Sequence, residues 1–174
     1  YLWNIKPKIE EESFIRDFLL IAIYTGARAE ELLFIYTKNI YLDKNYFIGG
    51  LETEAGTNRI IPIHPEIKHI FEKYYNNRNV FLFMAKNNKR TTYKQYNNMY
   101  QEFIKEHPKI KGKTAHCARH TLETELQKLN IRPIIINSII GHKNGSTGAD
   151  IYTHISIEEK LEAIKTITYK NGKI

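Results

Sequence analysis

The sequence predicts an α+β domain that is mainly helical and carries one small antiparallel sheet of three strands. Most of the chain has apolar side chains at helical spacing, whereas three short β-rich runs lie between residues 40 and 63, separated by turn-forming segments. The 174 residues, of which 42% are hydrophobic, are enough for a full hydrophobic core. We therefore expect residues 1–174 to form a single domain.

Helices account for most of the predicted structure. The first is expected from Pro7 to Tyr24, where apolar residues recur at helical spacing behind an acidic first turn. The dipeptide Thr25-Gly26 interrupts this pattern, and a helical pattern restarts at Ala29, so Arg28 is expected at a helix entrance. Five more helices are expected after the strands, over residues 66–75, 92–106, 116–129, 133–140 and 157–167.

The sheet is predicted from three runs rich in β-branched and aromatic residues, at 40–42, 46–48 and 59–63. The segments 43–45 and 55–58 between them contain Asp, Asn and Gly, which favour turns. Short strands joined by such turns favour a small antiparallel sheet.

Composition narrows the function classes only in part. Lys and Arg outnumber Asp and Glu by 26 to 19, giving a net charge of +7, which suits a polyanionic partner but also many other globular proteins. No apolar run approaches the roughly 18 residues of a membrane span, and the single Cys117 has no second cysteine to pair with. We expect a cytoplasmic protein with no membrane partner. The sequence begins without Met or an apolar leader, so we expect a piece of a longer polypeptide.

The candidate chemistry begins with His116 and Arg119, which lie one turn apart in a predicted helix and should project to the same side. Arginine offers a planar fork of donors that suits a phosphate, and a histidine can move a proton near neutral pH. The pair therefore fits phosphoryl transfer, although an ordinary surface pair has the same spacing. Gly141 should let the chain turn left-handed and aim His142 away from the preceding helix. Tyr152 carries a hydroxyl that could serve as a nucleophile or a ring that simply packs.

Taken in chain order, these motifs resemble the signature of tyrosine recombinases of the phage and transposon integrase type. They are Thr25-Gly26-Ala27-Arg28 with Glu31-Leu32, His116-x-x-Arg119, Gly141-His142 and Ile151-Tyr152-Thr153-His154. Residues 49–64 also look like the β-hairpin of integrases from phages and conjugative transposons. The resemblance covers nearly the whole chain and implies the catalytic domain of such a recombinase.

The resemblance implies site-specific DNA recombination and integration by strand cleavage and rejoining. In such an enzyme Arg28 and Arg119 would grip the scissile phosphate, and His116 and His142 would assist proton transfer and transition-state contacts. Tyr152 would attack to give a 3′-phosphotyrosyl link. Guanidinium groups neutralise the phosphorane and the covalent link retains the phosphodiester energy, so neither a cofactor nor a metal is expected.

One departure from the family pattern concerns a catalytic lysine that the hairpin generally carries just before the residue matched here by Thr53. This chain has Glu52 at that place, and residues 45–67 contain no lysine. Either another group such as Lys44 or Arg59 protonates the leaving oxygen, or activity is impaired. A carboxylate would repel the phosphate, so Glu52 is expected to point away from the site. Lys44 otherwise fits a solvated turn, and Arg59 a strand-surface charge or a DNA-backbone contact.

Several alternatives remain open at this stage. A catalytically impaired DNA-binding relative fits the Glu52 departure, and a type IB topoisomerase-like enzyme would share the phosphotyrosine chemistry while relaxing supercoils. An RNA-binding module would need stacking aromatics on an exposed sheet, and only three short strands are visible. Zinc ligation by Cys117 and its neighbouring histidines is disfavoured because His116 and Cys117 point to different sides of a helix. Cys117 is expected to fill the core.

The resemblance also implies partners. Double-stranded DNA is the expected substrate, bound as a homotetramer when the protein is full length, and an accessory DNA-bending or excision factor is a further expected partner. An upstream core-binding domain that closes round the duplex is expected outside the given sequence. The helix at 157–167 is the candidate for exchange between neighbouring subunits, or for docking on its own body. A bacterial or phage-encoded, DNA-associated protein is expected.

Overall fold

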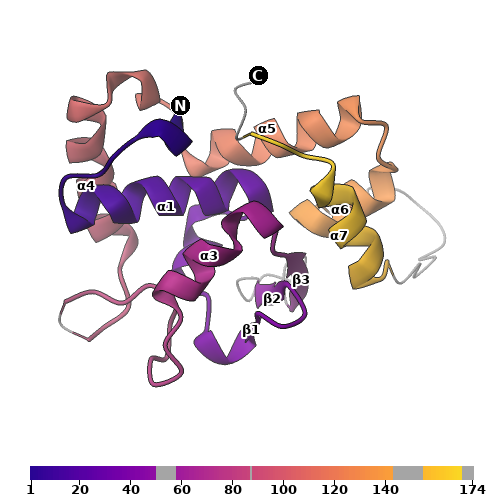
Figure 1. The fold of residues 1–174 in the computed structure, drawn as a ribbon, viewed down its shortest axis with the longest axis horizontal. Coiled ribbons are helices and arrows are strands. Elements are labelled where there is room, and N and C mark those ends of the chain that lie inside the picture. Colours follow the sequence, from indigo (N-terminus) through magenta and orange to yellow (C-terminus); the bar gives the residue numbers. More distant parts are fainter. Residues whose placement is uncertain (50–57, 87, 143–154, 170–174) are drawn as a thin grey trace.

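The computed structural model describes residues 1–49, 58–86, 88–142 and 155–169 and shows a mainly helical domain with one small sheet (Figure 1). The helices are α1 (Glu10–Thr25), α2 (Ala29–Leu33), α3 (Pro65–Tyr74), α4 (Tyr93–Glu106), α5 (Ala115–Lys128), α6 (Pro133–Ile140) and α7 (Ile157–Lys165). Three 3-10 helices are η1 (Leu2–Asn4), η2 (Thr37–Asn39) and η3 (Pro108–Ile110). The strands are β1 (Ile40–Tyr41), β2 (Tyr46–Gly49) and β3 (Arg59–Pro62). The predicted fold class is confirmed.

Helix α1 is the central element of the domain. It packs against α3, α4 and α5, with α4 at one end of the molecule and α6 and α7 together at the other (Figure 1). The helix ends at Thr25 and is capped by Gly26, whose φ of +63° lies in the left-handed region that favours glycine. A Cβ at Gly26 would lie 3.1 Å from side-chain atoms of both Leu122 and Ile140. Glycine therefore allows α5 and α6 to approach the end of α1, close to Arg28.

Both strand pairings are antiparallel, as predicted, and the strand order of the sheet is β1-β2-β3. Phe47 of β2 pairs with Ile61 of β3, and neither side chain has exposed surface. The ring of Phe47 lies 5.5 Å from that of Phe71 in α3, between ring centroids. Helices α6 and α7 pack against β3. Strand β3 therefore contacts both β2 and the two helices α6 and α7, which precede and follow residues 143–154 in the chain.

Helix α7 packs on its own chain. Ile164 is fully buried, and Lys160 places its ammonium group against backbone carbonyls, donating to the oxygens of Ile60 at 3.0 Å and Ser138 at 3.3 Å. Burial, followed by the positive charge of Arg59, lowers the pKa of Lys160 to about 8. The interactions of this one lysine join α7 to both β3 and α6.

The details that differ from the predictions are helix bounds and one side chain. Helix α1 begins at Glu10 rather than at Pro7, and α7 ends at Lys165 rather than at residue 167. The prediction that Cys117 fills the core is wrong, because its side chain is exposed in the first turn of α5. There the Cys117 N–H donates to the hydroxyl of the N-cap residue Thr114 at 3.4 Å, which fixes its place on the rim of the helix. Within the described residues, no helix combines the length and apolarity of a membrane span.

Candidate active site

Three arginine side chains from distant parts of the chain lie within electrostatic reach of one another. Arg28 precedes α2, Arg59 begins β3 and Arg119 lies in the second turn of α5. Arg119 is buried, and its pKa is lowered to about 10, first by burial and then by the positive charges of Arg28 and Arg59. The fold therefore concentrates positive charge where α1, α2, α5 and β3 meet.

One buried carboxylate holds two of these arginines. Glu31 is 2% exposed and accepts from both arms of the Arg59 guanidinium, Nη1 to Oε1 at 2.9 Å and Nη2 to Oε2 at 3.2 Å. The same carboxylate accepts the backbone N–H of Arg28 at 2.7 Å and lies 3.6 Å from Nη1 of the Arg28 guanidinium. Because one carboxylate faces two guanidinium groups and Arg119 adds a third, the cluster keeps an excess of positive charge that suits an anion.

Arg119 is oriented by the end of α1 and keeps donor capacity. Its Nη1 donates to the backbone oxygen of Gly26 at 2.8 Å. Its Nη2 is buried and has no hydrogen-bond partner among the described residues. Leaving a charged donor buried and unpaired is costly, so such groups commonly mark a binding function. Together with the half-exposed side chain of Arg28, this nitrogen is available to an oxyanion.

Gly141 makes room for the Arg59 side chain. Helix α6 ends at Ile140 and is capped by Gly141, whose φ is +74°. A Cβ at this position would meet the Arg59 guanidinium and lie 3.0 Å from its Cδ. A larger residue would therefore strain the backbone and displace Arg59. The glycine serves both the arginine cluster and the turn that leads to His142.

Histidines from two elements line the same region. On α5, His116 and His120 bring their Nε2 atoms to 3.0 Å of each other. Glu123, one turn further along α5, lies 3.8 Å from Nδ1 of His120 and 3.6 Å from Nδ1 of His142, which follows α6. Burial and then the positive charge of Arg119 lower the pKa of His142, while Glu123 raises it.

The structure brings together part of the predicted site. Arg28, Arg119 and His142 lie in one neighbourhood, since Arg28 and Arg119 both act electrostatically on His142. His116 is exposed whereas Arg119 is buried, so the expectation that the two meet one ligand stays a prediction. Tyr152 lies outside the described residues.

Five further residues named from the sequence are Glu52, Thr53, His154, Lys44 and Arg59. Glu52, Thr53 and His154 also lie outside the described residues. Lys44 is an exposed turn residue, in keeping with its expected place. Arg59 is neither a strand-surface charge nor an exposed contact, because its side chain is only 6% exposed and is bound to Glu31.

Sequence reasoning missed the parts played by two carboxylates of this region. Glu31 stood within a motif, but its binding of Arg59 depends on a contact across 28 positions of the chain, which periodicity does not reveal. Glu123 was within reach of a sequence argument, because residues three or four apart share a helix face and His116, His120 and Glu123 have that spacing. His120 was expected to hydrogen-bond a backbone group or to orient a catalytic neighbour, and its ring meets that of His116. The described residues contain no group of three His, Cys, Asp or Glu side chains arranged to hold a metal ion.

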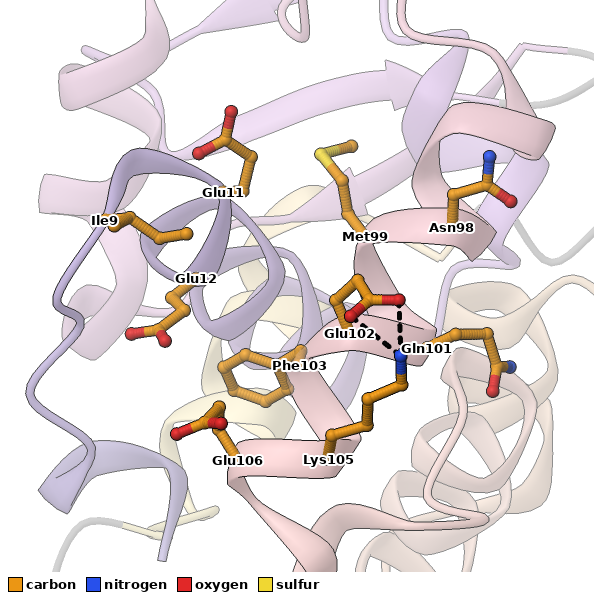
Figure 2. A pocket seen from close by; sticks show the side chains of 10 residues that line it. All are labelled: Ile9, Glu11, Glu12, Asn98, Met99, Gln101, Glu102, Phe103, Lys105 and Glu106. Carbon is orange, nitrogen blue, oxygen red and sulfur yellow. Dashed lines mark hydrogen bonds and ion pairs between the residues drawn. The ribbon is translucent and has the colours of Figure 1, made fainter.

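A pocket elsewhere on the domain has the wrong charge for a phosphate. It has a volume of about 670 Å³ and lies between the start of α1 and one face of α4 (Figure 2). Its lining includes four glutamates, Glu11, Glu12, Glu102 and Glu106. The ammonium group of Lys105 is bound by Glu102 at 2.7 Å, as the dashed lines in Figure 2 show. A polyanion would be repelled here, so the arginine cluster is the better candidate site.

Comparison with known sequences gives one consistent result. The profile of the phage integrase family matches residues 6–159. The chain is 26% identical over 163 residues to a tyrosine recombinase of Thermosipho africanus, covering 90% of this chain and 56% of that protein. It is 24% identical to the transposase from transposon Tn916 of Enterococcus faecalis, covering 87% and 45%. The chain thus spans about half the length of the curated relatives it matches.

Solved structures show the same fold. The integrase of transposon Tn1549, in complex with a circular intermediate DNA, aligns with a TM-score of 0.64 and 24% identity, over 81% of this chain and 60% of that one. The integrase from mycobacterium phage Brujita aligns with a TM-score of 0.69 and 17% identity, over 94% and 53%. The XerA recombinase gives 0.62 and 19%, over 93% and 65%.

Proposed function

The chain belongs to the phage integrase family, and we propose that it is the catalytic domain of a site-specific tyrosine recombinase that cuts and rejoins double-stranded DNA. The observation that carries this proposal is the arginine cluster, with a buried and unpaired donor on Arg119 and a half-exposed Arg28 beside it. A cluster of this kind is suited to a phosphodiester, whose transition state gains negative charge on the non-bridging oxygens.

The proposed chemistry uses the phosphate as the reacting centre. Arg28 and Arg119 donate to its non-bridging oxygens, and the hydroxyl oxygen of Tyr152 attacks phosphorus. The bond to the 5′ oxygen breaks, leaving a 3′-phosphotyrosyl link and a free 5′ hydroxyl. His116 and His142 contact the phosphate or move protons. Attack by a 5′ hydroxyl on the phosphotyrosine then reverses the step on a new partner strand.

The hairpin of this chain has no lysine to protonate the leaving 5′ oxygen. Arg59 is unsuited to the task, because both arms of its guanidinium are bound by Glu31 in the interior. Lys44 is exposed on the turn between β1 and β2 and is the remaining candidate of the two. With Glu52 at the hairpin position, we propose that cleavage occurs but is limited by the departure of the leaving group.

The proposed partners follow the family. The integrase of Tn1549 was solved with DNA, and we propose that this domain binds a DNA duplex over the face that carries the arginine cluster. A core-binding domain upstream, assembly as a homotetramer and an accessory DNA-bending or excision factor complete the proposal. A bacterial or phage origin fits the relatives. Exchange of α7 between subunits would require it to leave its present place on β3 and α6.

A nicked suicide substrate tests the proposed function. Cleavage releases a short strand that diffuses away, so the covalent protein–DNA adduct accumulates and can be counted on a denaturing gel. The chain should form this adduct, and Tyr152→Phe should form none while binding DNA with similar affinity, since only the nucleophilic oxygen is lost. Adduct at normal yield from the variant would refute the assignment.

Strand-exchange and plasmid-relaxation assays on the same protein distinguish recombination from a topoisomerase-like activity. A recombinase should join strands between two duplexes that carry its sites, whereas a type IB topoisomerase-like enzyme should relax a supercoiled plasmid without them. Relaxation of a plasmid lacking any site, with no strand exchange between sites, would favour the second function.

A further inference from the structure

Three side chains on α5 and one that follows α6 form a connected series. The proposed chemistry gives this series no common role. His116 and His120 meet through their Nε2 atoms at 3.0 Å. Glu123 then lies between two rings, with Oε2 3.8 Å from Nδ1 of His120 and Oε1 3.6 Å from Nδ1 of His142. The two histidines assigned to the reaction, His116 and His142, are therefore connected through His120 and one carboxylate.

The carboxylate constrains the proton positions. Both ring-to-carboxylate distances lie in the ion-pair range and are longer than a hydrogen bond, so Glu123 acts mainly through its charge. An anion beside Nδ1 favours a proton on that nitrogen. A neutral His120 with its proton on Nδ1 presents Nε2 as an acceptor, so the 3.0 Å contact requires His116 to donate from Nε2. In His142 a proton on Nδ1 leaves Nε2 to carry any second proton.

The charges round His142 compete. Arg119 on α5 and Arg28 before α2 oppose its protonation, as does His120 when charged, and Glu123 is the anion that favours it. Glu123 is about one-fifth exposed, so solvent screens it only in part. A DNA phosphate held by the arginines would add a second anion. Only a doubly protonated His142 can donate from Nε2 to a phosphate oxygen while its Nδ1 also carries a proton toward Glu123.

We propose that Glu123 is a positioning residue that orients His142 and His120 through their Nδ1 atoms and keeps His142 able to donate from Nε2 to the bound phosphate. This role rests on the proposed function of the site as a phosphodiester-cleaving centre. Glu123 itself does not touch the reacting atoms in this scheme. Its effect reaches the substrate through His142, with the arginines as the opposing charges.

The first test measures the histidines directly, in the DNA-free protein, by NMR titration of the ring Cε1–H signals. Glu123→Gln removes the charge and keeps the shape, so the titration midpoint of His142 should move to lower pH. Glu125→Gln is the matched control, since Glu125 lies on the same helix with nearly equal exposure, 19% against 20%, and pairs with Lys128. A His142 midpoint that matches that of the control variant would overturn the proposal.

The second test measures the pH profile of single-turnover cleavage on the nicked substrate. Removing Glu123 favours the uncharged His142, so the rate should begin to fall at a lower pH than in the parent. The ratio of parent to Glu123→Gln rates should therefore rise between pH 6 and pH 8, by about threefold or more for a neighbouring opposite charge. A ratio that is constant across this range would overturn the positioning role, because a purely structural defect lowers the cleavage rate by the same factor at every pH.

The two tests separate the proposal from the function on which it rests. If the parent forms no covalent adduct, the proposed function fails, yet the NMR titration still decides whether Glu123 controls the histidines. Should Glu123→Gln fail to fold, Glu123→Asp keeps the charge but draws it back by one methylene. It should then shift the His142 midpoint in the same direction by a smaller amount, and an unchanged midpoint would count against the proposal.

Discussion

Replacing Glu31 with Gln should destabilise the domain and the candidate site together. The carboxylate is 2% exposed, the Arg59 side chain 6%, and the two form a bidentate ion pair. Removing one partner of a buried pair costs about 3–5 kcal/mol, because the other charge stays buried and uncompensated. Gln retains one acceptor oxygen but turns an amide NH₂ toward Arg59 or the Arg28 backbone. We therefore expect a loss of about 3 kcal/mol, toward the lower end of that range.

Thermal and urea unfolding measure this loss. For a domain of this length, about 3 kcal/mol corresponds to a fall in melting temperature of roughly 6–12 °C. Glu162→Gln is the control, because Glu162 is 76% exposed and its pair with Lys165 should contribute little. Adding Arg59→Leu to Glu31→Gln removes the orphaned charge and should restore part of the stability. A Glu31→Gln variant as stable as the control would refute the idea that this pair supports the cluster.

Three further predictions concern single side chains. Arg119→Ala should slow single-turnover cleavage by about a hundredfold or more, the scale of losing one preorganised charged donor, and cleavage at the parent rate would show that Arg119 does not hold the phosphate. Lys160 has its pKa lowered to about 8 by burial and Arg59, so folding disfavours its charged form. The resulting destabilisation is full below about pH 8 and disappears as the pH rises to the unfolded pKa of about 10.4. The free energy of unfolding of the parent, relative to that of Lys160→Met, should therefore rise over this pH window. Urea unfolding at several pH values measures it. Glu52→Lys should accelerate cleavage by up to about a hundredfold if the hairpin position supplies the general acid, with a bridging 5′-sulfur substrate, which needs no acid, as the control on which parent and variant match.

Periodic elements were predictable from the sequence because their signals are local. The bounds of α1 were predicted to within a few residues, from its acidic first turn, its apolar stripe and the interruption at Thr25-Gly26. The three strands and their antiparallel pairing followed from short β-rich runs and turn residues. The 3-10 helices η1, η2 and η3 were missed, since such short turns depend on the packing around them more than on any periodic pattern.

The candidate site was predictable in its residue types but not in its electrostatics. The motifs singled out Arg28, Arg119 and His142, and the structure places these within reach of one another. The burial of Arg59 was missed because strand alternation alone does not tell which face a charged residue takes, and its partner Glu31 lies far away in the sequence. Cys117 was assigned to the core from its residue type, whereas capping by Thr114 places it on the exposed rim of α5.

The central claim is that the reaction passes through a phosphotyrosine on one residue among twelve tyrosines. The most direct measurement is mass spectrometry of the covalent adduct formed on a nicked suicide substrate, after digestion of both protein and DNA. We predict a single modified peptide in which Tyr152 carries a nucleotide linked through its 3′ phosphate. Attachment to any other residue, or linkage through a 5′ phosphate, would contradict the proposed function and the place of the arginine cluster in it.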